Sequence, residues 1–378
     1  MQIDLFRMER MQSLHWHRVD YDLSESGVLP LKVSELLGPD LAPDGLLDTA
    51  LGYPLSEGSD LLRERIAAFY PGATRDHVTV ANGGSEANHL TLWSLLEDGD
   101  RLALMLPNYM QGWGLGRHYA GRVDSFSLRL RGGRWALDRK GLERAVTKRT
   151  RVILVCNPNN PTGAVLDEEE MDAIVAAARR NSAWILADEI YRGAELAGGT
   201  TPSFFGRYDR VVATGGLSKA FGLPGLRIGW AVASPAVIRK IQIRHDYTTL
   251  TPGMLSDRLA AAALEPARRE SILARTRAIL RRQWPQLLAW LRTHDDVLEW
   301  APPVAGAIAL ARYRLPVGSV PLVERIRREQ SVLLVPGEML GAGRSLRFGF
   351  GYDIAKTLAG LGRVDVTLSA LVRGRKTG

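Results

Sequence analysis

The chain has 378 residues, of which 46% are hydrophobic and 24% charged, a globular composition that excludes a disordered or fibrous protein. No apolar run approaches the ~20 residues that a membrane span needs, and the N-terminus lacks the apolar core of a secretory signal. The single cysteine, Cys156, excludes an internal disulfide and a CxxC metal site. The net charge of +8 is spread along the chain, which favours a solvated surface over a nucleic-acid site. We therefore expect a cytoplasmic protein without a metal site.

Short apolar runs alternate with longer helical stretches from about residue 46 to residue 265. The segment before them, residues 1–45, contains several glycines and prolines and is predicted to be irregular. The apolar runs lie at residues 77–82, 101–106, 151–157, 183–189, 210–216 and 226–232. Several are apolar on both faces, as strands buried between two helix layers are. With helical segments such as 84–96 and 168–180 between them, they predict an α/β sheet of mostly parallel strands.

The pattern changes after residue 253. A helical stretch rich in arginine and leucine covers residues 253–293, followed by short strands near 305–313 and 345–350 and a last helix from about residue 355. This order predicts a second, smaller α+β domain. We place the large domain at residues 46–265 and the small domain at residues 1–45 plus 266–378.

The string GGLSKAFGLPGLRIGW (215–230) contains a lysine just after a predicted strand end. A lone Ser-Lys pair means little, because most lysines are solvated. Here a Gly- and Pro-rich turn and another strand follow, which brings Ser218 and Arg227 within reach of one anion. A hydroxyl and a guanidinium are suitable ligands for phosphate, and Lys219 lies beside them.

Two further strings follow predicted strands, where α/β folds place their ligands. In AWILADEIYRG (183–193), Asp188 ends a strand and Tyr191 lies three residues on. By itself this aspartate is equally well explained as a helix N-cap. In NPNNPTG (157–163), the prolines restrict the backbone and the turn orients Asn160, although a tight loop would have the same residues.

A fourth string, ANGGSEAN (81–88), follows a strand and opens a helix. Gly83, Gly84 and Ser85 would leave free N–H groups at the helix N-terminus, which is a ready site for phosphate. Glycine permits the close approach. A simple capped helix start explains the string about as well when it is taken alone.

Together and in this order, the four strings resemble the class I/II aminotransferase family of fold-type I enzymes that depend on pyridoxal 5'-phosphate (PLP). The resemblance extends from about residue 50 to residue 350. It implies the PLP-dependent transferase fold, with a mostly parallel, seven-stranded sheet between helices. It also implies PLP as the cofactor and a homodimer as the active form.

The resemblance assigns cofactor roles residue by residue. Lys219 would bind PLP as a Schiff base and move the proton from the substrate Cα. Asp188 would pair with the pyridine nitrogen, because an opposite charge favours the protonated ring. Asn160 and Tyr191 would hydrogen-bond the ring oxygen. The catalytic residues would then be Lys219, Asp188 and Tyr191.

The remaining positions match the family's phosphate, ring and substrate contacts. The phosphate would be held by Gly84, Ser85, Ser218 and Arg227. Tyr109 matches the aromatic residue that stacks on the ring, although core packing explains it too. Tyr53, in LGYPLSEG, matches a tyrosine that reaches the phosphate of the neighbouring subunit. Substrate would contact Gly27, Asn160 and Arg347, and Arg347, in SLRFGFG, would bind its α-carboxylate.

The chain departs from the family pattern in two places. Gly216 stands where the family often has a second phosphate-binding hydroxyl, and Thr214 is a doubtful replacement. No second arginine is evident for a side-chain carboxylate, which makes a dicarboxylate substrate less expected.

The N-terminal string also resembles an arginine-processing branch, but that branch has a histidine where Leu29 stands here. Glu25 is a candidate contact for a cationic substrate, with a turn-stabilising role as the alternative. His15 and His17 are candidates for a lid, with a surface position as the alternative.

These residues predict an amino-acid aminotransferase with a ping-pong mechanism. A second hypothesis keeps PLP but changes the reaction to that of a lyase, cyclase or oxidase acting on arginine or a related amino acid, because the active-site shape decides which bond breaks. A third, a PLP-sensing regulator, requires a DNA-binding helix-turn-helix before the fold, and residues 1–45 show no such pattern.

Overall fold

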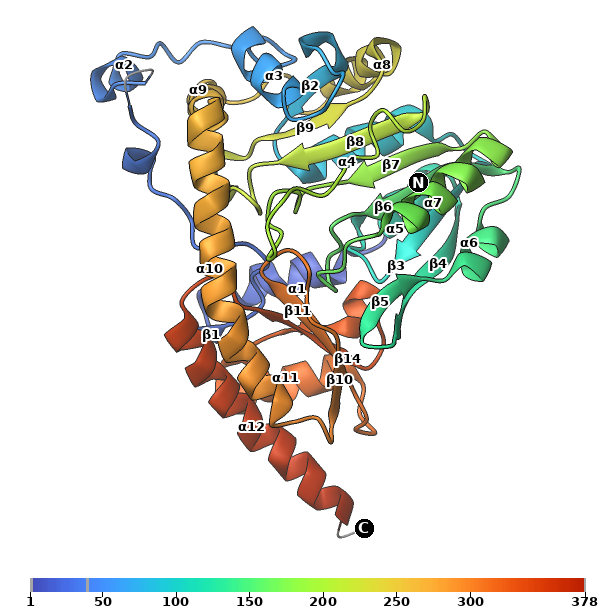
Figure 1. Cartoon of the computed structure of the whole chain (residues 1–378), viewed down its shortest axis with the longest axis vertical. Coiled ribbons are helices and arrows are strands. Elements are labelled where there is room, and N and C mark those ends of the chain that lie inside the picture. Colours follow the sequence, from blue (N-terminus) through green and yellow to red (C-terminus); the bar gives the residue numbers. More distant parts are fainter. Residues whose placement is uncertain (1–2, 39–40, 377–378) are drawn as a thin grey trace.

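A computed structural model describes residues 3–38 and 41–376. It has a larger α/β part around one sheet and a smaller part around another, and the long helix α10 (Pro266–Arg292) runs alongside both (Figure 1). Within the described residues, no helix is both long and apolar enough to cross a membrane.

The large sheet contains eight strands within the described residues. In spatial order they are β2 (Val78–Ala81), β9 (Gly229–Val232), β8 (Val211–Gly216), β7 (Trp184–Asp188), β6 (Thr150–Cys156), β3 (Arg101–Leu106), β4 (Arg122–Arg131) and β5 (Arg134–Leu137). The strands from β8 to β4 are parallel, whereas β9 and β5 run against their neighbours. The predicted α/β fold with a mostly parallel sheet is confirmed.

The strand number differs from the prediction of seven because β4 and β5 form a hairpin. The first half of β4 pairs with β3, and from Leu128 onward its described pairing is with β5. The sequence of β4 mixes exposed and buried positions along its length. It therefore lacks the continuous apolar run that marks a strand covered on both faces.

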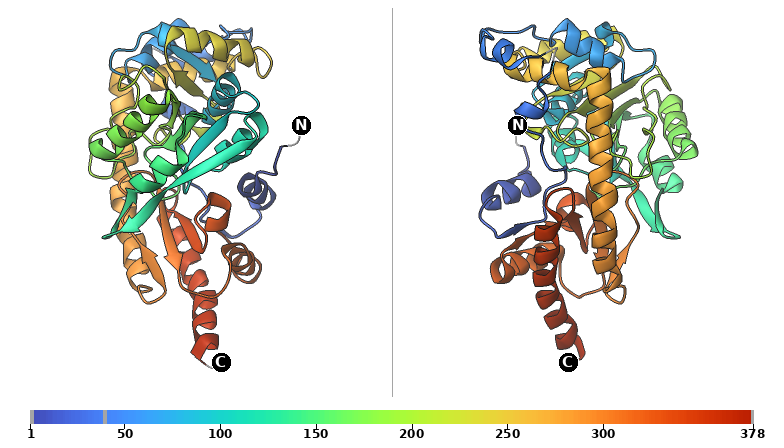
Figure 2. Two further views of the ribbon diagram at one scale, coloured as in Figure 1. Left: turned by 90° about the vertical axis from the view of Figure 1, so that its right-hand side faces the viewer. Right: turned by 60° about the vertical axis from the view of Figure 1, so that its left-hand side comes forward.

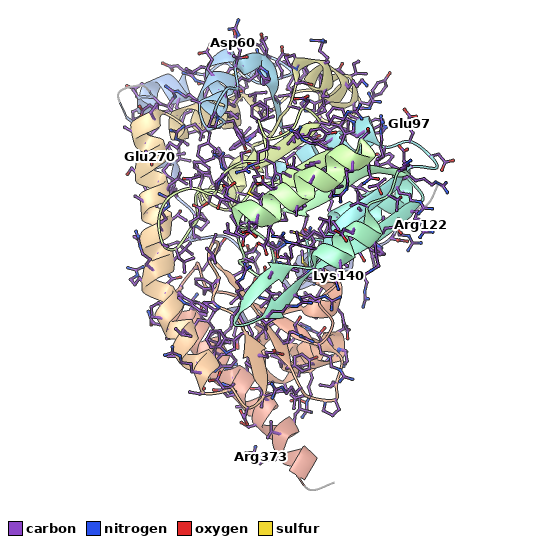
Figure 3. All side chains as sticks on the ribbon, turned by 45° about the vertical axis from the view of Figure 1, so that its right-hand side comes forward. Asp60, Glu97, Arg122, Lys140, Glu270 and Arg373 are labelled. Atoms are coloured by element: carbon purple, nitrogen blue, oxygen red, sulfur yellow. The ribbon has the colours of Figure 1, made fainter. Side chains whose placement is uncertain are left out.

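Alternate residues of the central strands enter two separate cores, which is why these strands are apolar on both faces. Leu102 and Leu104 of β3 pack in one core, while Ala103 and Met105 pack in the other. The first core includes residues of α4 (Gly84–Leu95), α5 (Gln111–Tyr119) and α8 (Pro235–His245). The second includes residues of α6 (Arg139–Ala145) and α7 (Glu168–Asn181). Figure 3 shows α6 and α7 over the near face of the sheet.

The smaller part is built on a four-stranded sheet in the order β10-β11-β14-β13. Its described elements are β10 (Leu298–Trp300), β11 (Ile308–Tyr313), β13 (Val335–Pro336), β14 (Ser345–Gly349), α11 (Ser319–Gln330) and α12 (Ile354–Lys376). The division into domains at residues 46–265 and 1–45 plus 266–378 remains a prediction.

The helical stretch expected at residues 253–293 is two helices, α9 (Met254–Ala263) and α10. Pro266 occupies the first turn of α10, where its missing N–H costs nothing. The side chain of Glu265 caps that turn by accepting hydrogen bonds from the backbone N–H groups of Ala267 and Arg268.

The N-terminal segment is more regular than predicted, because α1 (Arg7–His15) is a helix. Its buried face pairs Met8 with Gln12, one turn apart, so a polar residue replaces the apolar one that would have revealed the period. Further along, β1 (Tyr21–Asp22) pairs in parallel with β12 (Val332–Leu333). Figure 2 shows α1 at the level where the two parts of the molecule meet.

Strand β9 packs directly on the turn that starts α4. A Cβ atom added to Gly229 would lie 2.3 Å from the carbonyl carbon of Gly83 and from the nitrogen of Gly84. Only a glycine permits this approach of two backbones. The contact sets the position of the N-terminus of α4 against the sheet.

We predict that Gly229→Ala destabilises the fold by ~1–3 kcal/mol, because the added methyl overpacks this contact. The measurement is the urea concentration at the unfolding midpoint. Gly225→Ala is the matched control, since its added Cβ would meet no atom within 4 Å. Equal midpoints for the two variants would contradict the prediction.

Candidate active site

A cavity of about 410 Å³ lies at the carboxyl ends of β6, β7 and β8 and at the N-terminus of α4. Parallel strands bring their carboxyl ends to one edge of a sheet, which is where α/β folds bind ligands. The lining residues are Met8, Glu9, Gln12, Trp16, Glu25, Ser26, Gly84, Ser85, Asn88, Tyr109, Cys156, Asn160, Asp188, Ile190, Tyr191, Ser218, Lys219, Pro224, Arg227 and Arg347.

Most of the predicted site residues line this one cavity. They are Gly84, Ser85, Tyr109, Asn160, Asp188, Tyr191, Ser218, Lys219, Arg227 and Arg347. Gly27 lies against it, since an added Cβ would be 3.8 Å from Cδ of Lys219. Glu25 also lines it, whereas the rings of His15 and His17 do not. The individual roles of these residues stay predictions.

Tyr53 is the predicted residue that lies elsewhere. Its side chain is 84% exposed, in a surface groove beside Pro54 and Met254. The prediction assigns it to the cofactor phosphate of a neighbouring subunit, so an exposed position in one chain is compatible with that role.

Lys219 is enclosed by the cavity, and burial lowers the pKa of its amine from the ordinary lysine value. The guanidinium of Arg347 lowers that pKa further, while the carboxylate of Glu25 opposes both effects. A lowered pKa keeps more of the amine neutral and able to accept a proton or attack a carbonyl.

Asp188 ends β7 and is partly exposed to the cavity, and desolvation of its carboxylate raises its pKa. Two donors oppose this: Nδ2 of Asn88 at 2.8 Å and the backbone N–H of Ile190 at 3.1 Å. Asn88 in turn accepts a hydrogen bond of 2.6 Å from the hydroxyl of Thr214. The hydroxyl of Thr214 is therefore engaged in a hydrogen bond to Asn88.

Asn88 was not among the predicted site residues, although it lies inside the string ANGGSEAN. It is four residues after Gly84 on α4, and residues four apart share one face of a helix. The four-residue spacing from Gly84 could therefore have identified Asn88 as a residue of the site.

Arg347 lies on β14 and is almost fully buried, with 1% of its surface exposed. Its guanidinium donates to Oδ1 of Asn160 at 2.9 Å and to the carbonyl of Ser24 at 2.5 Å. Its Nε and the hydroxyl of Tyr191 are both buried, and neither has a hydrogen-bond partner among the described residues. Buried polar atoms are normally paired, so these two are suited to a ligand.

The other end of the cavity is built for an anion. Gly83 has a φ of 100°, and a Cβ added there would lie 2.4 Å from Nη2 of Arg227. The guanidinium thus occupies the space over the N-terminus of α4, near Ser85 and Ser218. A helix N-terminus and a guanidinium together attract phosphate.

Gly216, which replaces the family's second hydroxyl, has no room for a side chain. Its added Cβ would lie 2.9 Å from Cδ1 of Ile190 and 2.9 Å from the carbonyl oxygen of Ile228. The close packing of β8 on β9 therefore accounts for this departure.

Helix α1 contributes a wall that the prediction of an irregular segment missed. Met8, Glu9, Gln12 and Trp16 all line the cavity, at the spacing of one helix face. The carboxylate of Glu9 accepts a hydrogen bond of 2.9 Å from the hydroxyl of Tyr109, and burial raises the pKa of that hydroxyl. Within the described residues, no group of three His, Cys, Asp or Glu side chains is arranged to hold a metal ion.

The family model for aminotransferase class I and II matches residues 39–363. The chain belongs to this family. Family membership makes PLP its cofactor, and the anion end, the desolvated Asp188 and the enclosed Lys219 fit that group.

Three proteins are similar to this chain over nearly its whole length. Capreomycidine synthase of Streptomyces vinaceus is 30% identical over 365 residues, which cover 94% of this chain and 92% of that protein. The solved structure of a PLP-dependent aminotransferase from Streptococcus suis 89-1591 is similar with a TM-score of 0.90 at 28% identity, covering 98% of this chain and 99% of that one. The PLP-dependent cyclase OrfR has a TM-score of 0.87 at 29% identity, covering 99% and 98%.

We predict that Lys219 reacts with PLP at a lower pH than an ordinary lysine does, because the pKa of its amine is lowered and the neutral form persists as the pH falls. The measurement is borohydride reduction of protein and PLP across a pH series, followed by peptide mass spectrometry. Lys140, exposed on α6, is the internal control (Figure 3). A labelling midpoint for Lys219 at or above that of Lys140 would contradict the prediction, and Lys219→Ala should lack the label.

Proposed function

We propose that this chain is an aminotransferase that moves an amino group between an α-amino acid and a 2-oxo acid by a ping-pong mechanism. The observation that supports it is one cavity that holds a lysine of lowered pKa, a desolvated carboxylate and a buried arginine: Lys219, Asp188 and Arg347. Bound PLP supplies an electron sink for the charge that develops at Cα.

In this proposal the protein's own groups bind, orient and move a proton. Arg347 binds the substrate α-carboxylate through two parallel N–H donors, exchanging its contact with Ser24. That contact holds Cα near the amine of Lys219, which removes its proton. With PLP bound, the carboxylate of Asp188 would accept a hydrogen bond from the protonated ring nitrogen, and Asn160 and Tyr191 would hydrogen-bond the ring oxygen.

The phosphate end and the ring contact complete the binding site. Gly84, Ser85 and Ser218 hold the phosphate, and Arg227 offsets its charge. Tyr109 packs on the ring and is held by Glu9. Helix α1 excludes water from this wall of the cavity, which strengthens every charge interaction inside it.

A second candidate is a PLP-dependent lyase, cyclase or oxidase that acts on arginine or a related amino acid. Two carboxylates, Glu9 and Glu25, line the cavity on the side of α1 and the N-terminal segment, and a cationic side chain would complement them. Within the described residues, the two arginines that line the cavity are already assigned in this proposal: Arg227 to the cofactor phosphate and Arg347 to the substrate α-carboxylate. The similarity to capreomycidine synthase and to OrfR over nearly the whole chain favours this candidate.

A homodimer in the cytoplasm, with Tyr53 completing the partner's site, is part of the proposal. Leu47 and Leu51 are also strongly exposed and lie close to Tyr53 in the sequence. A group of exposed apolar side chains is typical of an interface. The sedimentation coefficient tests this part, and a monomer at the working concentration would oppose it.

We predict that one amino acid, added to the PLP-loaded protein without a 2-oxo acid, changes the cofactor absorbance once and releases one equivalent of 2-oxo acid. That stoichiometry follows from a ping-pong mechanism, in which the second half-reaction waits for an acceptor. Catalytic consumption of the amino acid, with release of ammonia or uptake of oxygen, would exclude the aminotransferase and support the second candidate.

We predict that Glu25→Gln lowers kcat/KM for arginine relative to norleucine by about tenfold to a hundredfold, because a charge-assisted hydrogen bond contributes about 1.5–3 kcal/mol. The ratio of the two substrates cancels the effect of Glu25 on the pKa of Lys219. Glu9→Gln should act in the same direction. Glu270→Gln, on the exposed side of α10, is the control (Figure 3). Equal losses for both substrates would exclude a cationic substrate.

A further inference from the structure

Two buried side chains, Thr214 and Asn88, form a hydrogen-bonded series that ends at the carboxylate of Asp188. The hydroxyl of Thr214, on β8, is 2.6 Å from Oδ1 of Asn88, and Nδ2 of Asn88, on α4, is 2.8 Å from Oδ2 of Asp188. All three come from different elements, and Thr214 is directly opposite Asp188 in the pairing of β7 with β8. This series of hydrogen bonds therefore depends on the register between β7 and β8.

The direction of these hydrogen bonds follows from chemistry. An ionised carboxylate only accepts, so Asn88 has to present its NH₂ group to Asp188. Its oxygen then faces Thr214, and the hydroxyl of Thr214 has to donate. A protonated Asp188 would remove this constraint, because its O–H could donate to the amide oxygen or its C=O could accept from the NH₂ group. The arrangement is thus matched to the charged form of Asp188.

We infer that Asn88 and Thr214 are positioning residues that keep Asp188 ionised, and so keep the proton on the ring nitrogen of bound PLP. This inference rests on the proposed role of Asp188. Burial favours the neutral carboxyl, and besides Asn88 the backbone N–H of Ile190 donates to the carboxylate. A side-chain substitution cannot remove that backbone donor, so the amide of Asn88 is the donor that mutation can change.

Other titratable groups surround the same carboxylate. Electrostatic neighbours of Asp188 are Lys219 after β8, Cys156 at the end of β6, Glu189 and Tyr191 after β7, and Tyr109 before α5. The ammonium form of Lys219 favours the carboxylate. Once that amine is bound to PLP, the hydrogen bonds of Asn88 and Ile190 carry more of the stabilisation.

The test is the ¹⁵N chemical shift of the ring nitrogen in protein loaded with ¹⁵N-labelled PLP at neutral pH. The variants are Asn88→Leu, Thr214→Val and the conservative Thr214→Ser. We expect a protonated ring nitrogen in the unchanged protein. In Asn88→Leu the carboxylate is a stronger base and draws the shared proton, so the signal moves toward that of neutral pyridine. The dissociation constant of PLP should rise about tenfold.

Thr214→Val should shift the signal in the same direction by a smaller amount, and Thr214→Ser should restore it. If Asn88→Leu fails to fold, Thr214→Val and Thr214→Ser still test the inference. Thr214→Ser loses a methyl group but keeps the hydroxyl donor, so a loss of packing alone would not move the ring-nitrogen signal. An unchanged signal in both Asn88→Leu and Thr214→Val would overturn the inference. A shift in Asn88→Leu alone would remove Thr214 from it. A neutral ring nitrogen in the unchanged protein would instead contradict the proposed role of Asp188.

Discussion

The desolvated carboxylate of Asp188 is the constraint on which the site depends. A charge taken out of water costs several kcal/mol unless it is paired and hydrogen-bonded. Here α4 supplies Asn88, the turn after β7 supplies the N–H of Ile190, and β8 supplies Thr214 behind Asn88. The order of the strands and their register therefore have a chemical consequence, because a shift of one residue would turn Thr214 to the other face of the sheet.

Charged side chains of both signs line the rest of the cavity. Arg227 lies over the start of α4, Lys219 follows β8, and Arg347 reaches in from β14 of the smaller sheet. Glu9 and Glu25 enter from the N-terminal segment. Arg227, just before β9 of the large sheet, and Arg347, on β14 of the smaller one, give the cavity two cationic positions that suit a molecule with a phosphate and a carboxylate.

The reaction that follows removal of a proton depends on parts of the cavity outside the shared PLP core. The relatives that match nearly the whole chain include a protein named an aminotransferase and two whose names describe a synthase and a cyclase. In the second candidate function, α1 and the segment around Glu25 supply the carboxylates that complement a cationic substrate. These elements contact the cofactor site through Tyr109 and Arg347, by way of Glu9 and Ser24.

The α/β fold, the family, the cofactor and about half of the residues that line the cavity followed from the sequence, because motifs at strand ends mark both local backbone geometry and ligand chemistry. It missed the β4–β5 hairpin and α1, whose half-exposed faces leave weak apolar patterns. Only the tertiary structure brought Glu9 to Tyr109 and Thr214 to Asn88, across separations of 100 and 126 residues. Such contacts depend on how helices and strands pack, and no local pattern in the chain encodes that geometry.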